Sequence, residues 1–184
     1  MNQIDPIFSR KSSVNFSGEE IDNIDLNAIV KAAMWAPSSR NKQPWKLIAI
    51  KNSSQKFNSI IESCSESNKK WARKAGVIIV FCTQDSENTR TPEIYLDIGF
   101  AGQNAMIKAT SMGYENHPYG GWNEDAIKNI LTMPNNSNVV FLLAIGPRGD
   151  LNRLSDELLE KHNKNRDRNP IESHFNLDSW SPLF

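Results

Sequence analysis

The sequence predicts a single domain in which a β-sheet is sandwiched between helices. Three short apolar runs, 46–50, 77–81 and 139–145, have the length and composition of strands. Segments with helical periodicity separate them, and a sheet flanked by helices is one of the few layer arrangements that buries both kinds of element. With 184 residues the chain is long enough for a substantial core, and its sequence contains no internal repeat or low-complexity linker.

Composition excludes several classes of protein. The 21 basic and 21 acidic residues balance, so the chain as a whole has no electrostatic attraction to nucleic acid or to a membrane surface. No apolar run is long enough to span a bilayer, and residues 1–6 lack the pattern of a secretory signal. Three scattered histidines argue against a zinc site. Cys64 and Cys82 lie in apolar segments without a CxxC spacing, which predicts free thiols and a cytoplasmic location.

The elements of the N-terminal half follow from caps and periodicity. Residues 17–20 fit a capping box with Ser17 as the N-cap, and apolar residues then recur at helical spacing until Pro37 ends the helix. The run 46–50 is the first strand. Apolar residues spaced i, i+3, i+4, i+7 predict a second helix over 57–64, and the β-branched run 77–81 predicts a strand covered on both faces.

The C-terminal half begins with a long helix. Thr91 and a proline at the first turn start it, and Gly113 ends it. Small residues line much of this helix and permit the close approach of another helix, so we interpret it as a central or interface helix; a plain core helix is the alternative. The stretch 114–123 that follows is rich in glycine, proline and aromatic residues. A short helix over 126–131, the strand 139–145 and a polar helix over 155–162 follow.

The most informative segment is the polar loop between the first helix and the first strand. Prolines at both ends of this loop fix its backbone. The hydroxyl and amide groups between them can both donate and accept hydrogen bonds; they belong to Ser38, Ser39, Asn41 and Gln43. Such a loop suits a planar ligand with many acceptors, and an ordinary helix-ending turn is the alternative.

Three other segments could bind a ligand. Residues 10–12, an arginine, a lysine and a serine, could contact a phosphate through charge-assisted hydrogen bonds. Arg166 and Arg168 fall on one side of an extended segment, where two guanidinium groups also suit a phosphate. The paired glycines within 117–122 would let the backbone approach a ligand closely. For these three segments the alternatives are, in the same order, a solvated N-terminal arm, a salt-bridged run on the surface and a simple glycine turn.

In their order along the chain, these motifs resemble the FMN-dependent nitroreductase family, from about Phe8 to about Phe175. The Pro-Ser-Ser-x-Asn-x-Gln-Pro-Trp loop is the most specific of them. The resemblance implies an α+β fold, a three-layer α/β/α sandwich with a mainly antiparallel central sheet, and a homodimer with FMN at the subunit interface. It also implies an enzyme that takes hydride from NADH or NADPH and reduces a nitroaromatic, a quinone or a similar small acceptor in ping-pong fashion. The flavin does this chemistry, so no catalytic side chain and no metal is expected.

The resemblance also implies which residues line the FMN site. Two basic clusters would hold the phosphate and ribityl end, an asparagine and a proline–glycine turn would contact the isoalloxazine ring, and the polar loop would come from the partner subunit. In that order the residues are Arg10, Lys11, Ser12, Arg166 and Arg168; Asn68, Pro118, Tyr119, Gly120 and Gly121; and Pro37, Ser38, Ser39, Asn41 and Gln43.

Departures from the family pattern leave other functions open. Val14 stands where many members have a basic residue, and Trp71 stands where some have a lysine. The loss of positive charge beside the flavin would make its reduction harder. The alternatives are a flavin-binding or redox-sensing protein with little turnover, a relative with dehydrogenase, dehalogenase or flavin-fragmenting activity, and an FMN-free dimeric scaffold. We expect one domain over 1–184, with a polar helical insert at 146–165 that caps the site or the dimer edge and a C-terminal tail at 171–184.

Overall fold

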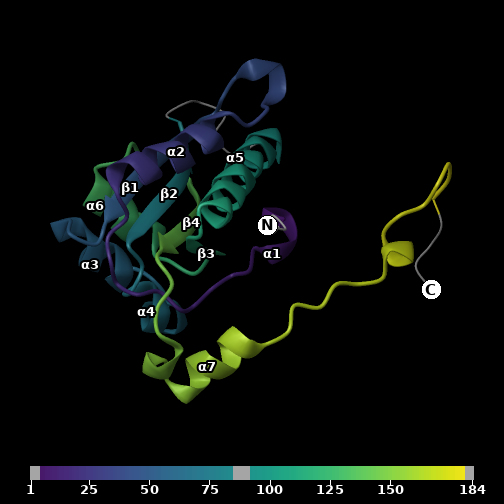
Figure 1. Cartoon of the computed structure of the whole chain (residues 1–184). Helices are drawn as coiled ribbons and strands as arrows, with labels where there is room; N and C mark the ends of the chain where they lie inside the picture. The colour runs from purple at the N-terminus through teal and green to yellow at the C-terminus, as the bar shows by residue number, and fades with distance from the viewer. Residues whose placement is uncertain (1–4, 85–91, 181–184) are drawn as a thin grey trace.

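A computed structural model describes residues 5–84 and 92–180 of the chain. In these residues a four-stranded antiparallel sheet, with strand order β1-β2-β4-β3, lies between two layers of helices (Figure 1). The strands are β1 (Trp45–Lys51), β2 (Val77–Thr83), β3 (Glu115–Tyr119) and β4 (Val139–Gly146). The predicted α+β sandwich is thereby confirmed. Thr91 and the two ends of the predicted domain, 1–4 and 181–184, lie outside the described residues.

The helices divide between the two faces of the sheet. One face is covered by α2 (Asn23–Met34) and α5 (Pro92–Ser111); the other is covered by α3 (Gln55–Glu62), α4 (Glu66–Ala72) and α6 (Glu124–Leu131). The short helix α1 (Pro6–Ser9) lies near the N-terminus, and α7 (Asp156–Asn163) precedes the C-terminal tail. None of the described helices is long and apolar enough to cross a bilayer.

Strand β2 shows how the sequence builds both halves of the core. Its successive side chains point to opposite faces of the sheet. Val77, Ile79 and Phe81 pack with α2 and α5, and Ile78 and Val80 pack with the helices of the other layer. Every residue of this strand is buried. The prediction of a strand covered on both faces is confirmed.

The predicted N-cap of the first helix is wrong. The helix begins five residues later, where the Asp22 carboxylate accepts a hydrogen bond from the Ile24 N–H at 2.6 Å. The Ser17 hydroxyl instead accepts from the Glu19 N–H and closes a turn. Gly18 lies between them at φ 87°, in the left-handed region, which prevents a helix from starting there.

Strand β3, which forms the first half of the stretch 114–123, was not predicted from the sequence. Strand β3 lies at the edge of the sheet and pairs with β4. Pro118 cannot donate a ladder hydrogen bond, and prolines within sheets are confined to such edges. The helix α4 was also not predicted, because Trp71 and Ala72 are its only buried residues and too few to show helical periodicity.

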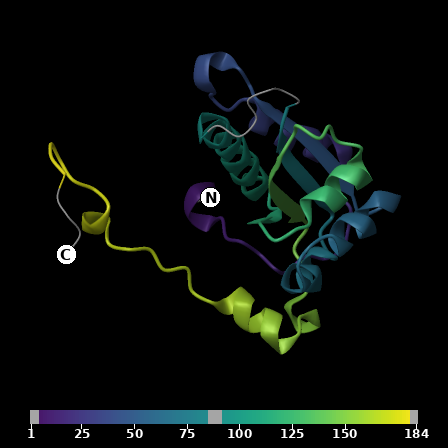
Figure 2. The same ribbon diagram turned by 180° about the vertical axis from the view of Figure 1, so that it is seen from behind.

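The tail leaves the body of the molecule after α7. In both views it runs away from the sheet and helices (Figures 1 and 2). Large apolar side chains are exposed along it and on the surface of α5. They include Phe175, Leu177 and Trp180 in the tail, and Leu96 and Phe100 on the helix. Exposed apolar surface of this extent marks an interaction face.

Candidate functional site

Arginines from both ends of the chain meet beside α1. Arg10 ends this helix, and Arg166 lies in the extended segment after α7. The Arg166 guanidinium donates hydrogen bonds to the carbonyl of Arg10 and, at 2.6 Å, to that of Phe8. Burial, and then the charges of Arg166 and Arg168, lower the pKa of Arg10. The two predicted basic clusters therefore form a single cluster.

This basic cluster contains buried donors without acceptors. Within the described residues, Arg10 Nη1 is buried and has no hydrogen-bond partner. His162 Nε2 lies 3.0 Å from Lys11 Nζ, which must be the donor, so the imidazole proton is on Nδ1; that atom is also buried without a partner. A buried donor without an acceptor is costly, and an anion bound beside Arg10 would satisfy its guanidinium by a charge-assisted hydrogen bond.

The N-terminal arm lies along the edge strand β3. Ser12 forms a parallel bridge with Asn116, and the Ser13 N–H donates to the Asn116 carbonyl at 3.0 Å. The Ser12 side chain is exposed on this arm. The arm thus carries the predicted phosphate residues to the β3 edge of the sheet, beside the start of that strand.

Helix α7 is fixed beside this arm by contacts to α4. Lys70 Nζ and a Glu157 carboxylate oxygen are 2.6 Å apart, and Lys161 Nζ lies 5.8 Å from the centre of the Trp71 ring. With the Lys11–His162 contact, these interactions place the predicted helical insert over the arm. Sequence reasoning missed His162, because nothing in the pattern around it points to the distant Lys11.

The turn after β3 is held against α4. Asn68 Nδ2 donates to the Gly120 carbonyl at 2.6 Å, and the Ser65 N–H donates to the Gly121 carbonyl at 2.7 Å. Gly121 has φ 82°, and a Cβ there would lie 3.2 Å from the Ser65 hydroxyl oxygen. The structure therefore brings together Asn68 and the predicted glycine turn, which sequence spacing alone could not place side by side.

Three residues named from the sequence have their side chains in the core. Tyr119 makes an edge-to-face contact with Trp71 at 5.0 Å, and the Cys64 thiol lies 3.9 Å from its hydroxyl oxygen. Val14 and Trp71 are 2% and 1% exposed in the same core cluster. Both cysteines are free and buried, as predicted.

His117 adds a pH-dependent element to this cluster. It stacks on Trp71 at 4.2 Å and donates from Nδ1 to the Ser13 carbonyl at 2.8 Å. Burial, opposed by that hydrogen bond and reinforced by Lys161 and Arg10, lowers the pKa of His117 to about 4. The imidazole therefore stays neutral in the folded protein at pH values where it is protonated in the unfolded chain.

Because of His117, the free energy of unfolding is expected to fall by about 2 kcal/mol when the pH is lowered from 7 to 5. The unfolded state binds a proton below pH 6.5, while the folded state does so only near its pKa of about 4. The stability that depends on a neutral His117 is therefore fully present above pH 6.5 and is lost as the pH falls. Urea denaturation of wild type and of His117→Gln, which cannot titrate, measures it. Equal pH dependence of the two proteins would contradict the assignment.

The polar loop is preformed by hydrogen bonds from both its ends. The Ser39 N–H donates to a carboxylate oxygen of the buried Asp97 at 3.0 Å, and the Gln43 N–H donates to the Ser38 hydroxyl at 2.9 Å. Asn41 and Gln43 have φ values of 56° and 49°, which non-glycine residues rarely adopt. Asp97 was missed from the sequence, although a carboxylate on the apolar face of a helix was an available signal.

The loop and the basic cluster lie at opposite ends of α5. The loop is bonded to Asp97 near the start of the helix, while Asn116, beside the N-terminal arm, donates to the Thr110 hydroxyl near its end. Thirteen helical residues separate these two attachment points, a distance of about 20 Å. Within one chain, the predicted residues of the polar loop therefore lie far from those of the basic cluster.

Comparison with known proteins agrees with this architecture. Residues 7–147 match the model of the nitroreductase family. A protein of Archaeoglobus fulgidus named "Putative NADH dehydrogenase/NAD(P)H nitroreductase" is 25% identical over 147 residues, which are 76% of this chain and 82% of that protein. A solved structure of an oxidoreductase containing FMN superposes with a TM-score of 0.88 and 29% identity, and covers 97% of this chain and 93% of its own.

A second solved structure, a nitroreductase family protein from Clostridium novyi NT, has a TM-score of 0.73 and 27% identity, over 88% of this chain and 92% of its own. The antiparallel sheet between two helical layers, matched along nearly the whole chain, defines a protein of nitroreductase-like fold. The chain belongs to the nitroreductase family, which is a family of oxidoreductases.

Proposed function

We propose that the protein is an FMN-dependent oxidoreductase that takes hydride from NADH or NADPH and reduces a nitroaromatic, a quinone or a similar small acceptor in ping-pong fashion. The observation that carries the proposal is the buried Nη1 of Arg10, which has no hydrogen-bond partner in the described part of the chain and lies beside Arg166 and Arg168. Such a cluster suits a dianionic phosphate. The FMN in a solved structure 29% identical to this chain supports the same ligand.

The residues of this chain would bind and orient the cofactor. The three arginines, with Lys11 and Ser12, would hold the phosphate end. The Asn68 amide fixes the Gly120–Gly121 turn, whose exposed backbone would lie against the ring. Bound FMN supplies the hydride transfer, and the protein supplies binding and orientation, so we assign no catalytic side chain.

A homodimer would complete the site. The loop at one end of α5 cannot reach the basic cluster of its own chain, so we propose that the partner's loop closes each site. Gly99 has no heavy atom within 4 Å of the position a Cβ would take, and Leu96 and Phe100 are exposed beside it on α5. This open apolar face would let two copies of the helix approach closely.

Replacing Phe100 with glutamate is expected to raise the dissociation constant of the dimer at least about tenfold, because charge would be buried in an apolar contact. Light scattering after size exclusion measures the mass, and flavin absorbance of the same peak measures occupancy. Lys56→Glu, an exposed position on α3, is the control. A Phe100→Glu dimer with full flavin content would contradict the proposed interface.

The reaction itself is tested with the purified, flavin-loaded protein. Anaerobic mixing with NADH or NADPH should bleach the flavin absorbance, and a quinone added afterwards should restore it. Flavin that stays oxidised with both donors would contradict the reductase and favour the alternative, a flavin-binding or redox-sensing protein. That alternative rests on Val14 and Trp71, which place no positive charge near the site. The free, buried Cys64 and Cys82 support a cytoplasmic location, where thiols stay reduced.

A further inference from the structure

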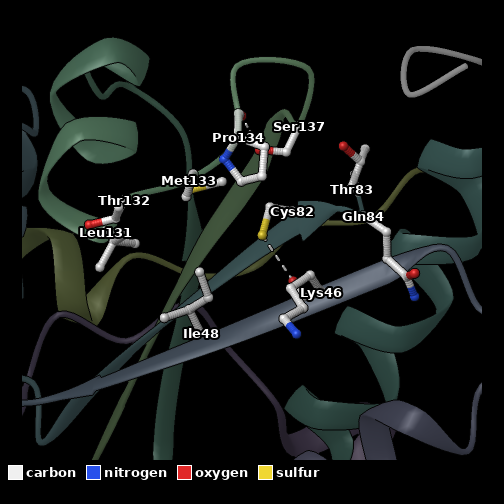
Figure 3. A pocket seen from close by; sticks show the side chains of 10 residues that line it. All are labelled: Lys46, Ile48, Cys82, Thr83, Gln84, Leu131, Thr132, Met133, Pro134 and Ser137. Atoms are coloured by element: carbon white, nitrogen blue, oxygen red, sulfur yellow. Dashed lines mark hydrogen bonds between the residues drawn. The ribbon is translucent and has the colours of Figure 1, made fainter. Parts of the chain in front are cut away.

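A cavity of about 500 Å³ lies at the β1 edge of the sheet, on the face covered by α3 and α6 (Figure 3). The first residues of β1, the last residues of β2 and the loop after α6 form its walls. Lys46 and Ile48 point to this face because alternate residues of a strand share a face. Cys82 is paired with Lys46 in the antiparallel ladder and lies across from it.

None of the residues predicted to bind FMN lines this cavity. The cavity borders the polar loop, because the Gln84 amide of its lining donates to the Gln43 carbonyl at 2.8 Å. Asp97 holds the polar loop on the opposite face, where α5 covers the sheet. The glycine turn follows β3, at the other edge of the sheet. The cavity is therefore a second site that neighbours the polar loop and lies outside the residues assigned to the flavin.

The lining combines an apolar wall with one cation. Ile48, Leu131 and Met133 supply apolar surface and pack against the core. Lys46 is the charged residue of the lining, and among the described residues its ammonium forms no ion pair. The Thr83 hydroxyl is already used, since it accepts from the Asn138 N–H at 2.9 Å.

The Cys82 thiol belongs to the apolar wall. It donates to the Lys46 carbonyl at 3.1 Å, the dashed contact in Figure 3. Burial raises its pKa to about 11, so the sulfur remains a protonated thiol at neutral pH. Because the thiolate is the nucleophilic form, the cavity is suited to reversible binding and not to covalent chemistry at this sulfur.

We propose that this cavity binds a small organic anion, an apolar ring or branched chain that carries one carboxylate. The apolar body lies against Ile48, Leu131 and Met133, and the carboxylate pairs with the Lys46 ammonium. The volume falls in the range of ligand pockets, about 300–1,000 Å³, and a mostly apolar wall with few polar groups is typical of them.

The test compares two probes of the same shape, 2-naphthoate and the neutral 2-naphthamide. The full-length protein is labelled at its methionine methyl groups for NMR titration, and Met133→Leu identifies the Met133 signal. We expect 2-naphthoate to shift that signal saturably and to bind about fivefold more tightly than 2-naphthamide, the contribution of one exposed ion pair.

Lys46→Gln should lower the affinity for 2-naphthoate about fivefold and leave the affinity for 2-naphthamide unchanged. The control Lys56→Gln should change neither affinity. Lys46 and Lys56 are both exposed, so neither substitution threatens folding. The proposal is overturned if the Met133 signal shows no saturable shift, if both probes bind equally well, or if the two lysine variants behave alike.

Discussion

Replacing Arg10 and Arg168 together with alanine is expected to raise the dissociation constant of FMN at least about 100-fold, because each loses a charge-assisted contact worth about 1.5–3 kcal/mol. The two side chains belong to one basic cluster, and Arg10 has a buried donor without a partner. Quenching of flavin fluorescence during titration of the apoprotein measures the change.

The matched ligand for this experiment is riboflavin, which has the same ring but no phosphate. Its affinity should be the same for the wild type and the double variant, since the arginines are proposed to contact the phosphate alone. The single variant Arg168→Ala should lie between the two. An equal loss of riboflavin and FMN would show that the substitutions disturb the fold or the ring site, and the phosphate role would be wrong.

Replacing Trp71 with lysine is expected to lower the free energy of unfolding by about 3–5 kcal/mol. The indole is 1% exposed and packs against Phe16, His117 and Tyr119. A lysine there would leave much of that space empty and would bring an ammonium close to Lys161, whose Nζ already lies 5.8 Å from the ring centre. Burying a cation without a counter-ion adds to the cost.

Urea denaturation of Trp71→Lys and of Trp71→Phe separates these effects. The phenylalanine variant keeps an aromatic ring in the stack and should lose clearly less stability than the lysine variant. The flavin potential of the lysine variant is the second measurement. A stable Trp71→Lys protein whose flavin is easier to reduce would instead show that position 71 faces the cofactor.

The sequence predicts an element well where burial follows a regular period. Phe57, Ile60 and Ile61 mark α3, and the unbroken apolar run marks β2. Strand β3 has no such signature, because Asn116 and His117 are accommodated by hydrogen bonds to distant groups. Asn116 donates to the Thr110 hydroxyl at 2.9 Å, and His117 donates to the Ser13 carbonyl at 2.8 Å. Only the tertiary structure supplies those partners.

In the candidate site, too, contacts between residues far apart in the sequence could not be predicted from local patterns. Periodicity cannot bring Arg10 to Arg166, since both lie outside regular strands and long helices; the order of motifs and the family resemblance led to that pairing. Asp97 and His162 carry no sequence motif, and their contacts to the loop and to Lys11 become visible only in the folded chain. The sequence therefore offered candidates for ligand binding, but not the residues that hydrogen-bond to them from distant parts of the chain.

The position of Arg166 has a consequence for how the protein is made. It contacts the carbonyl of Arg10, 156 residues earlier in the chain. All four strands precede residue 147, so a nascent chain can in principle assemble its sheet before Arg166 and Arg168 are synthesised. The basic cluster is complete only after residue 168 has been synthesised. A chain that stops before Arg166 would therefore keep the four described strands but not the complete cluster.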